Sequence, residues 1–160
     1  MQASLEELMD QYVGTGTVEW IGIRLEKKAE VVSVNSAILD PAYGIEGDHY
    51  AGRSGKRQVT LIQAEHLPAI ASMLQCDRVI PEQLRRNIVV SGINLLALKN
   101  KTFQLGEAVL AYTGLCHPCS RMEESLGVGG YNAMRGHGGI TARVISPGKV
   151  QIGNICGVFD

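Results

Sequence analysis

Short β-prone runs separated by glycine and polar residues dominate the hydrophobic pattern of this chain. The runs "GTVEWIGIRL" (16–25) and "EVVSVNSAIL" (30–39) flank a charged stretch, which predicts a β-hairpin. Six further runs resemble strands, namely "QVTLI" (58–62), "NIVVSG" (87–92), "TFQLG" (102–106), "AVLAYTG" (108–114), "TARVIS" (141–146) and "KVQIG" (149–153). Because the regular strand–helix alternation of a Rossmann sheet is missing, the pattern favours a mainly β fold, a closed or nearly closed barrel.

A few short helices are expected beside these strands. Ser4 and Glu7 have capping-box spacing and precede an apolar stripe, which predicts a short amphipathic N-terminal helix ending at Gly14. The stretches "QAEHLPAIASML" (63–74) and "IPEQLRRN" (80–87) also read as helical, each with a proline near its first turn.

Two glycine-rich segments interrupt the pattern. Residues 40–58 have neither a helical nor a strand period, and a loop of this length in a compact domain is often functional. Residues 127–139 carry six glycines, so we expect them to be too glycine-rich for the core. This second segment would be either a lid over a pocket or an ordinary long turn.

Composition and charge narrow the classes of protein and partner. A chain of 160 residues suits one domain that needs no disulfide or metal to fold. With 15 basic and 16 acidic residues the net charge is −1, so we expect neither nucleic acid nor membrane as a partner. The acidic, polar N-terminus and the lack of a run of about 18 apolar residues favour a cytoplasmic protein.

The four cysteines are expected to be thiols, as in other proteins of a reducing compartment. Cys76 and Cys156 lie in ordinary structural sequence and are expected to be small buried apolar residues. Cys116 and Cys119 form a Cys-x-x-Cys motif within "LCHPCSRMEESLG" (115–127).

Three interpretations of this motif are open. A structural zinc site needs four ligands, and the sequence has no second close pair to complete the shell. A redox dithiol would suit the strand, Cys-His-Pro-Cys and helix order, but the surrounding elements look antiparallel rather than βαβ. In the third interpretation Ser120 and Glu123 form a capping box, which places Cys119 just before the first helical turn, where a thiolate is favoured.

Several motifs in a fixed order closely resemble the MOSC domain, named for the carboxy-terminal part of molybdenum cofactor sulfurases. They are "GIEGDHYAGRSGKRQVTLIQAEHL" (44–67), "LRRNIVVSGINL" (84–95), "FQLGEAVLAYTG" (103–114), "CHPCSRME" (116–123) and "GHGGITARVI" (136–145). The resemblance extends over residues 14–158. It implies a MOSC-type β-barrel that fills the chain as a single domain, 1–160, preceded by the short N-terminal helix.

The resemblance also implies a cysteine that carries sulfur or ligates molybdenum in the anionic molybdenum cofactor, a molybdopterin. The family's Pro-Cys falls on Pro118 and Cys119, so Cys119 takes the catalytic and metal-binding role and Cys116 is secondary. Some stand-alone relatives reduce N-hydroxylated compounds. Pyridoxal phosphate is associated with the family through a separate sulfurase domain that this sequence lacks, so a separate protein would donate sulfur or electrons.

The resemblance and the positions of basic residues suggest which side chains would hold this cofactor. Arg86, Asn87 and Arg143 would bind its phosphate, and Arg53 lies on the glycine-rich loop beside Lys56 and Arg57. His117 and His137 would donate to an anion or tune the thiol, or they are exposed loop residues.

Four functions remain open at this point. The chain is a molybdenum-dependent reductase, a sulfur carrier with a persulfide on Cys119, a non-catalytic cofactor-binding module, or a dithiol oxidoreductase that uses Cys116 and Cys119.

Overall fold

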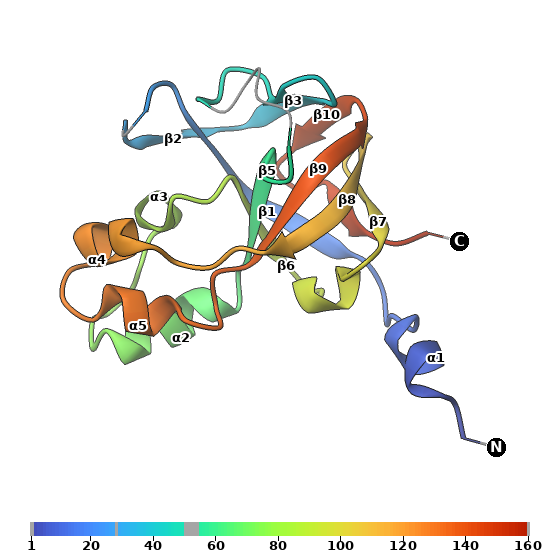
Figure 1. Cartoon of the computed structure of the whole chain (residues 1–160), viewed down its shortest axis with the longest axis horizontal. Coiled ribbons are helices and arrows are strands. Elements are labelled where there is room, and N and C mark those ends of the chain that lie inside the picture. The colour runs from blue at the N-terminus through green and yellow to red at the C-terminus, as the bar shows by residue number, and fades with distance from the viewer. Residues whose placement is uncertain (1, 28, 50–54, 160) are drawn as a thin grey trace.

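A closed β-barrel forms the centre of the structure, a computed structural model that describes residues 2–27, 29–49 and 55–159 (Figure 1). Its strands are β1 (Gly16–Arg24), β5 (Val59–Gln63), β6 (Ile88–Ser91), β7 (Thr102–Leu105), β8 (Ala108–Leu115), β9 (Ile140–Ser146) and β11 (Ile155–Gly157). Their order is β11-β7-β8-β9-β5-β6-β1, and pairing of β1 with β11 closes the ring. The mainly β, barrel-type fold predicted from the sequence is confirmed.

Strand β1 is the longest barrel strand and makes the closing contacts. Its first two residues pair with β11, its middle with β6, and its last residues with β2 (Val31–Val34), which confirms the predicted hairpin. The following strand β3 (Ser36–Asp40) pairs with β4 (Gly44–Ile45) and β10 (Gly148–Gln151) in a second sheet at one end of the barrel (Figure 1). The run predicted as one strand over 30–39 is therefore divided between two sheets.

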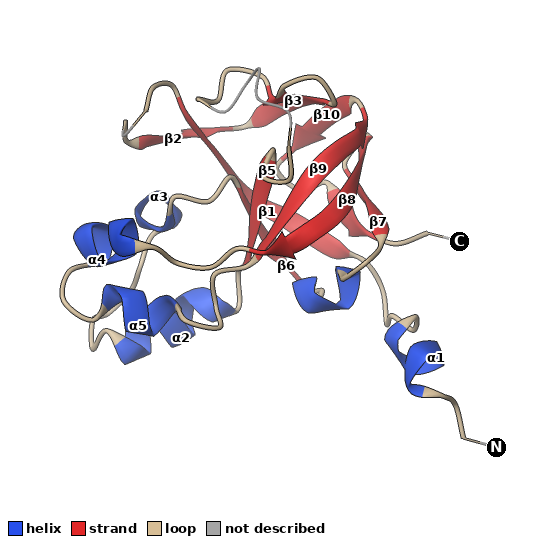
Figure 2. Ribbon diagram, in the orientation of Figure 1, coloured by secondary structure: helices blue, strands red, loops and turns tan. Residues whose placement is uncertain are grey.

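Four short helices lie together on one side of the barrel (Figure 2). They are α2 (His66–Met73), α3 (Pro81–Leu84), α4 (Ser120–Leu126) and α5 (Gly130–Met134). Strand β5 runs parallel to β6, and α2 and α3 form the crossover between them, an arrangement that the sequence pattern did not predict. A 3₁₀ turn, η1 (Leu95–Leu98), follows β6.

Apolar side chains form two cores, one on each face of the β5–β6 wall. Phe103 and Leu110 belong to the core inside the barrel, whereas Met122 and Met134 belong to the core between the wall and the helices. Strand β5 is buried along its whole length because it separates the two cores. This explains why its sequence is a continuous apolar run rather than an alternating one.

The prediction that residues 127–139 are too glycine-rich for the core is wrong. Helix α5 forms inside this segment and buries Ala133 and Met134. Gly127 and Gly129 have positive φ and lie at helix ends, since Gly127 ends α4 and Gly129 precedes α5. The apolar residues that pack lie within α5, after both of these glycines.

The N-terminal helix α1 (Leu5–Met9) is shorter than predicted, and its apolar face is exposed. It begins with the predicted capping box of Ser4 and Glu7. The chain then turns toward the barrel, where Asp10 forms a salt bridge of 2.6 Å with Lys101 and the Tyr12 hydroxyl donates to the Ala97 carbonyl. In the described part of the chain, no helix is long and apolar enough to cross a membrane.

Gly139 is required where β9 begins, and a substitution tests this. Its φ is +85°, and a Cβ there would overlap the carbonyl oxygen of Leu61 on β5. Left-handed backbone costs an L-residue roughly 1–2 kcal/mol, and the overlap adds to this. We expect Gly139→Ala to lower the free energy of unfolding in urea by at least about 2 kcal/mol.

Gly136→Ala is the matched control, because Gly136 has φ +82° but nothing within 4 Å of the added Cβ. We expect it to lose only the conformational contribution of about 1 kcal/mol. Equal losses in the two variants would show that the contact with β5 does not matter.

Candidate functional site

The segment from Cys116 to Cys119 leaves the barrel at the end of β8 and leads into α4. The Cys116 N–H donates to the Gly139 carbonyl at 2.8 Å, which extends the β8–β9 pairing by one residue. Cys119 is the N-cap of α4, with extended backbone at φ −131° and ψ −176°. The predicted position of Cys119 before the first helical turn is confirmed, and its side chain is exposed whereas Cys116 is buried.

The predicted capping box of Ser120 and Glu123 is wrong. Because Cys119 is the N-cap, Glu123 lies one position too late for the box and turns to the next helix instead. Its carboxylate accepts the N–H groups of Gly129 and Tyr131, each at 3.0 Å. These backbone hydrogen bonds lower the pKa of Glu123. The carboxylate therefore fixes α4 against the start of α5.

Arg86 hydrogen-bonds to the segment 116–119, here called the cysteine segment, at the Cys116 carbonyl. Its buried guanidinium donates to three backbone carbonyls, those of Gly138 (2.8 Å), Leu84 (3.2 Å) and Cys116 (3.3 Å). A Cβ on Gly138 would overlap the Cys116 carbonyl. The segments around Cys116 and Gly138 can therefore approach this closely only because residue 138 is a glycine. Burial is the largest influence on the pKa of Arg86 and lowers it. The guanidinium nevertheless stays protonated, as arginines do in proteins.

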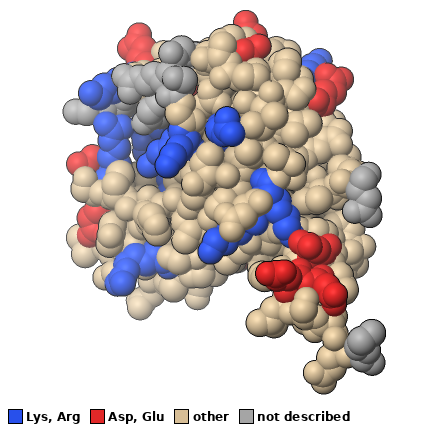
Figure 3. Space-filling view, turned by 45° about the vertical axis from the view of Figure 1, so that its right-hand side comes forward, with Lys and Arg blue, Asp and Glu red and all other residues tan. Residues whose placement is uncertain are grey.

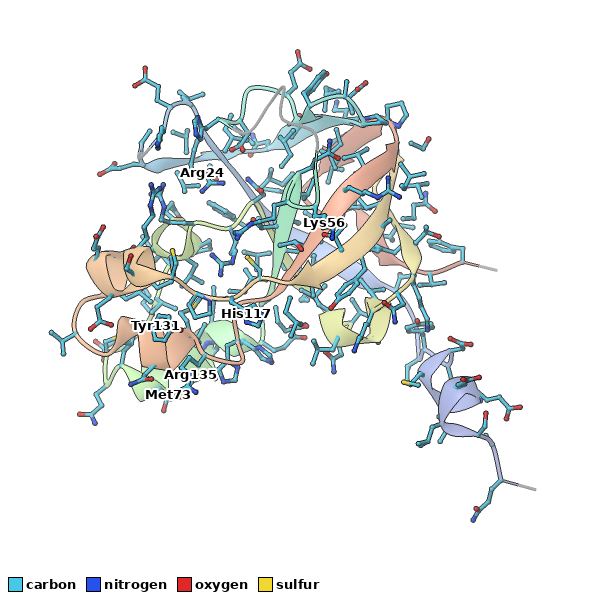
Figure 4. All side chains as sticks on the ribbon, viewed as in Figure 1. Arg24, Lys56, Met73, His117, Tyr131 and Arg135 are labelled. Carbon is cyan, nitrogen blue, oxygen red and sulfur yellow. The ribbon has the colours of Figure 1, made fainter. Side chains whose placement is uncertain are left out.

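A basic cavity of about 330 Å³ opens beside Cys119. It is lined by five arginines together with Cys119, Thr60 and Met122; the arginines are Arg24, Arg57, Arg85, Arg86 and Arg121. None of these described lining residues is acidic. Figure 3 shows several basic side chains gathered on one side of the molecule, and Figure 4 marks Arg24. Arginines arranged in this way bind phosphate and other oxyanions.

Contacts of the backbone and of one carboxylate position these arginines. Asp48 accepts the backbone N–H of Arg24 at 2.8 Å, and its Oδ1 lies 3.9 Å from the Arg24 Nε. Arg85 ends α3 in a left-handed conformation, and its Nη1 donates to the Ala29 carbonyl at 3.2 Å. Arg57 Nη2 donates to the Cys116 Sγ at 3.5 Å, which links the arginine cluster to the buried thiol.

Two other residues predicted to bind the cofactor, Asn87 and Arg143, do not line the basic cavity. Asn87 is buried, and its side chain accepts the Thr60 N–H at 3.1 Å and donates to the Gly22 carbonyl at 3.1 Å, so it joins β5 and β1 to the start of β6. Arg143 is exposed on β9 and is not among the residues that line the basic cavity. Arg53 lies outside the described residues.

A second cavity, of about 290 Å³, adjoins the same cysteine segment. His117 and Pro118 contribute to its lining, which is mostly apolar, and so His117 faces this cavity rather than the basic one. Figure 4 shows His117 on the connection between β8 and α4. His137 lies against His66, with 3.3 Å between their Nδ1 atoms and perpendicular rings.

The remaining cysteines differ from one another. Cys156 is buried in the barrel as expected, and burial raises its pKa to about 12. Cys76 is exposed in the turn after α2, so the prediction that it is buried is wrong. Within the described ranges, no group of three or more His, Cys, Asp and Glu side chains lies close enough to hold a metal ion.

Of the arginines that line the basic cavity, Arg24 and Arg121 are not named as candidates in the sequence analysis. They lie at the end of β1 and in the first turn of α4, and only the folded barrel brings them together. Arg57 is named in the sequence analysis only as a neighbour of Arg53, and Arg85 occurs only within the motif at 84–95. A basic residue at the end of a strand or the start of a helix has no local pattern that distinguishes it from a surface residue.

The His66–His137 contact predicts a loss of stability in mild acid. Burial, followed by repulsion from His137, lowers the pKa of His66 in the folded state, although Glu65 opposes this. The unfolded chain therefore binds the proton more readily, and stability falls as the pH drops below the unfolded value of about 6.5. We expect the Tm of the wild type minus the Tm of His66→Gln to be more positive at pH 7.5 than at pH 5.5. A difference that is independent of pH would contradict this assignment.

Known proteins share the fold described above. The MOSC domain model matches residues 45–155 of the chain. The structure resembles the YuaD protein of Bacillus subtilis with a TM-score of 0.77 and 23% identity, over 91% of this chain and 98% of that one. No curated protein matches the sequence.

Two structures of YiiM are also similar. For YiiM from Escherichia coli the TM-score is 0.70 with 19% identity, over 90% of this chain and 70% of that one. For YiiM from Geobacillus stearothermophilus it is 0.71 with 12% identity, over 91% and 75%. At these identities the likeness concerns the fold. Since the family model spans more than half of the sequence, the chain belongs to the MOSC domain family, which is associated with molybdenum-cofactor-related proteins.

Proposed function

We propose that this protein binds a molybdenum cofactor in the basic cavity and uses Cys119 as its reactive sulfur. The observation that carries the proposal is the convergence of an exposed thiol and five arginines on one cavity of about 330 Å³. A phosphate-bearing pterin requires cationic donors, and molybdenum is a metal that thiolate sulfur suits. The residues present therefore fit the group that the family implies.

The arginines that line the cavity would have two different roles in binding the cofactor. Arg57 and Arg121 reach the cavity from the loop before β5 and from α4, and they would bind the phosphate directly. Arg86 already donates to three carbonyls, so it would contribute its charge and the position of the segment above it. Asn87 would then act on the site only through the fold, by fixing β6 beside β5.

When bound, the cofactor supplies a metal that can exchange electrons and oxygen with a substrate. In the reductase form of the proposal the substrate is an N-hydroxylated compound. The N–O bond breaks, two electrons from a separate donor protein and two protons are taken up, and an amine and water are released. The chain's own contribution is to bind the cofactor through its arginines and to hold the thiol of Cys119 at the edge of the cavity.

In the carrier form, Cys119 holds a persulfide. Its thiolate attacks the outer sulfur of a persulfide on a donor protein, the S–S bond of the donor breaks, and the donor leaves as a thiolate. Exposure of Cys119 permits this approach, whereas the burial of Cys116 does not. Mass spectrometry of the protein after exposure to such a donor would detect one added sulfur atom on the Cys119 peptide.

Removing one cavity arginine tests the binding site. We expect Arg121→Ala to weaken cofactor retention about tenfold or more, because a charge-assisted hydrogen bond to phosphate contributes about 1.5–3 kcal/mol. The measurement is the molar ratio of molybdenum to protein after purification from a host that makes the cofactor. Arg135→Ala is the control, since Arg135 follows α5, is exposed and lies outside the cavity. Equal molybdenum content in the two variants, or stoichiometric zinc in place of molybdenum, would refute the proposal.

Paired cysteine substitutions separate one reactive thiol from a dithiol. We expect Cys119→Ala to lose molybdenum and reductase activity, and Cys116→Ser to keep both, because only Cys119 lines the basic cavity. Unfolding measurements on Cys116→Ser serve as a control, since Cys116 is buried. If Cys116→Ser folds but is as inactive as Cys119→Ala, the chain is a dithiol oxidoreductase.

A further inference from the structure

The second cavity, unlike the basic one, is not lined by charged Lys, Arg, Asp or Glu side chains among the described residues. Its volume is about 290 Å³, and its apolar walls include Leu95, Leu115, Pro118 and Ile140. None of the described residues that line it is Lys, Arg, Asp or Glu, and none of them also lines the basic cavity. Transfer of a charged ligand into such a site would cost desolvation energy with no counter-charge to offset it. The cavity therefore favours a neutral ligand.

A few polar atoms in this cavity have bonding capacity to spare. Asn94 Oδ1 accepts the Leu96 N–H at 3.0 Å, and His66 Nδ1 faces His137. Within the part of the chain that the structure describes, no hydrogen bond occupies Asn94 Nδ2 or His66 Nε2. An apolar pocket with a small number of such groups is typical of small-molecule sites.

The walls of the cavity are held rigidly. Gln63 donates to the Ile93 carbonyl at 2.7 Å and accepts the Leu95 N–H at 2.9 Å, so it fixes the wall on the η1 side. On the other side, Arg86 holds the Cys116 and Gly138 carbonyls. A preformed pocket loses little conformational entropy when a ligand binds.

Volume sets the size of the ligand. An apolar cavity of about 150 Å³ binds benzene, and this one is roughly twice as large. We propose that the cavity binds a neutral molecule of two fused rings whose ring N–H donates to His66 Nε2. The ligand would also cover Leu96 and Leu115, which are 56% and 47% exposed beside the cavity. This site is separate from the proposed cofactor cavity and does not depend on it.

Titration of the ¹⁵N-labelled full-length protein with indole tests this site. We expect saturable shifts of the backbone amides of Leu96, Cys116 and His117, with a Kd in about the millimolar range or below. Indole-3-acetate, which carries a negative charge, should bind at these amides about tenfold more weakly.

Two variants fill the cavity from its edge. We expect Leu96→Trp and Leu115→Trp each to raise the indole Kd about tenfold or more, whereas Leu25→Trp, at an exposed position outside the cavity, leaves it within about twofold. Arg121→Ala should bind indole as the wild type does, which separates this test from that of the cofactor site. The proposal is overturned by the absence of saturable shifts, by equal affinity for the charged analogue, by wild-type affinity in both cavity variants, or by loss of binding in Arg121→Ala.

Discussion

The buried guanidinium of Arg86 is the constraint on which the candidate site depends. A charge with so little access to water must be surrounded by hydrogen-bond acceptors, since an unpaired buried charge is strongly destabilising. The acceptors here are carbonyls from three segments distant in sequence, at Leu84, Cys116 and Gly138. The end of α3, the cysteine segment and the start of β9 must therefore meet at one point. Cys119 takes its position from this junction and from the first turn of α4 rather than from bonds of its own side chain.

A second buried polar network, made by the neighbouring residue Asn87, joins strands of the barrel. Asn87 and Thr60 exchange hydrogen bonds through both backbone and side chain, and the Asn87 amide also reaches β1 at Gly22. These bonds align β1, β5 and β6, and so they bring Arg24 at the end of β1 to the same cavity as Arg86. The adjacent pair Arg86–Asn87 thus combines a residue in the cavity wall with one that acts on the site by aligning the strands beside it.

The sequence predicts those features that depend on local pattern. Alternating and β-branched runs predict the strands, and the helix start after Pro118 predicts where Cys119 lies. Parallel pairing of β5 with β6 and closure through β11 depend on contacts between distant strands, which local propensity does not encode. The arginine cluster is missed for the same reason, because Arg24 and Arg121 become neighbours of the thiol only after the barrel closes. Helix α5 is missed because glycine content was weighed by number rather than by position at the helix ends.

The arginine cluster itself is hard to explain as a device for stability. Like charges gathered in one cavity repel each other, and this repulsion destabilises the folded state. Asp48 pairs with Arg24 and carbonyls surround Arg86, but among the described residues no salt bridge involves Arg57 or Arg121. Folded proteins keep such local conflicts where function requires them. An anion bound between these arginines would remove the repulsion, and the thiol at the edge of the same cavity would then lie beside that anion.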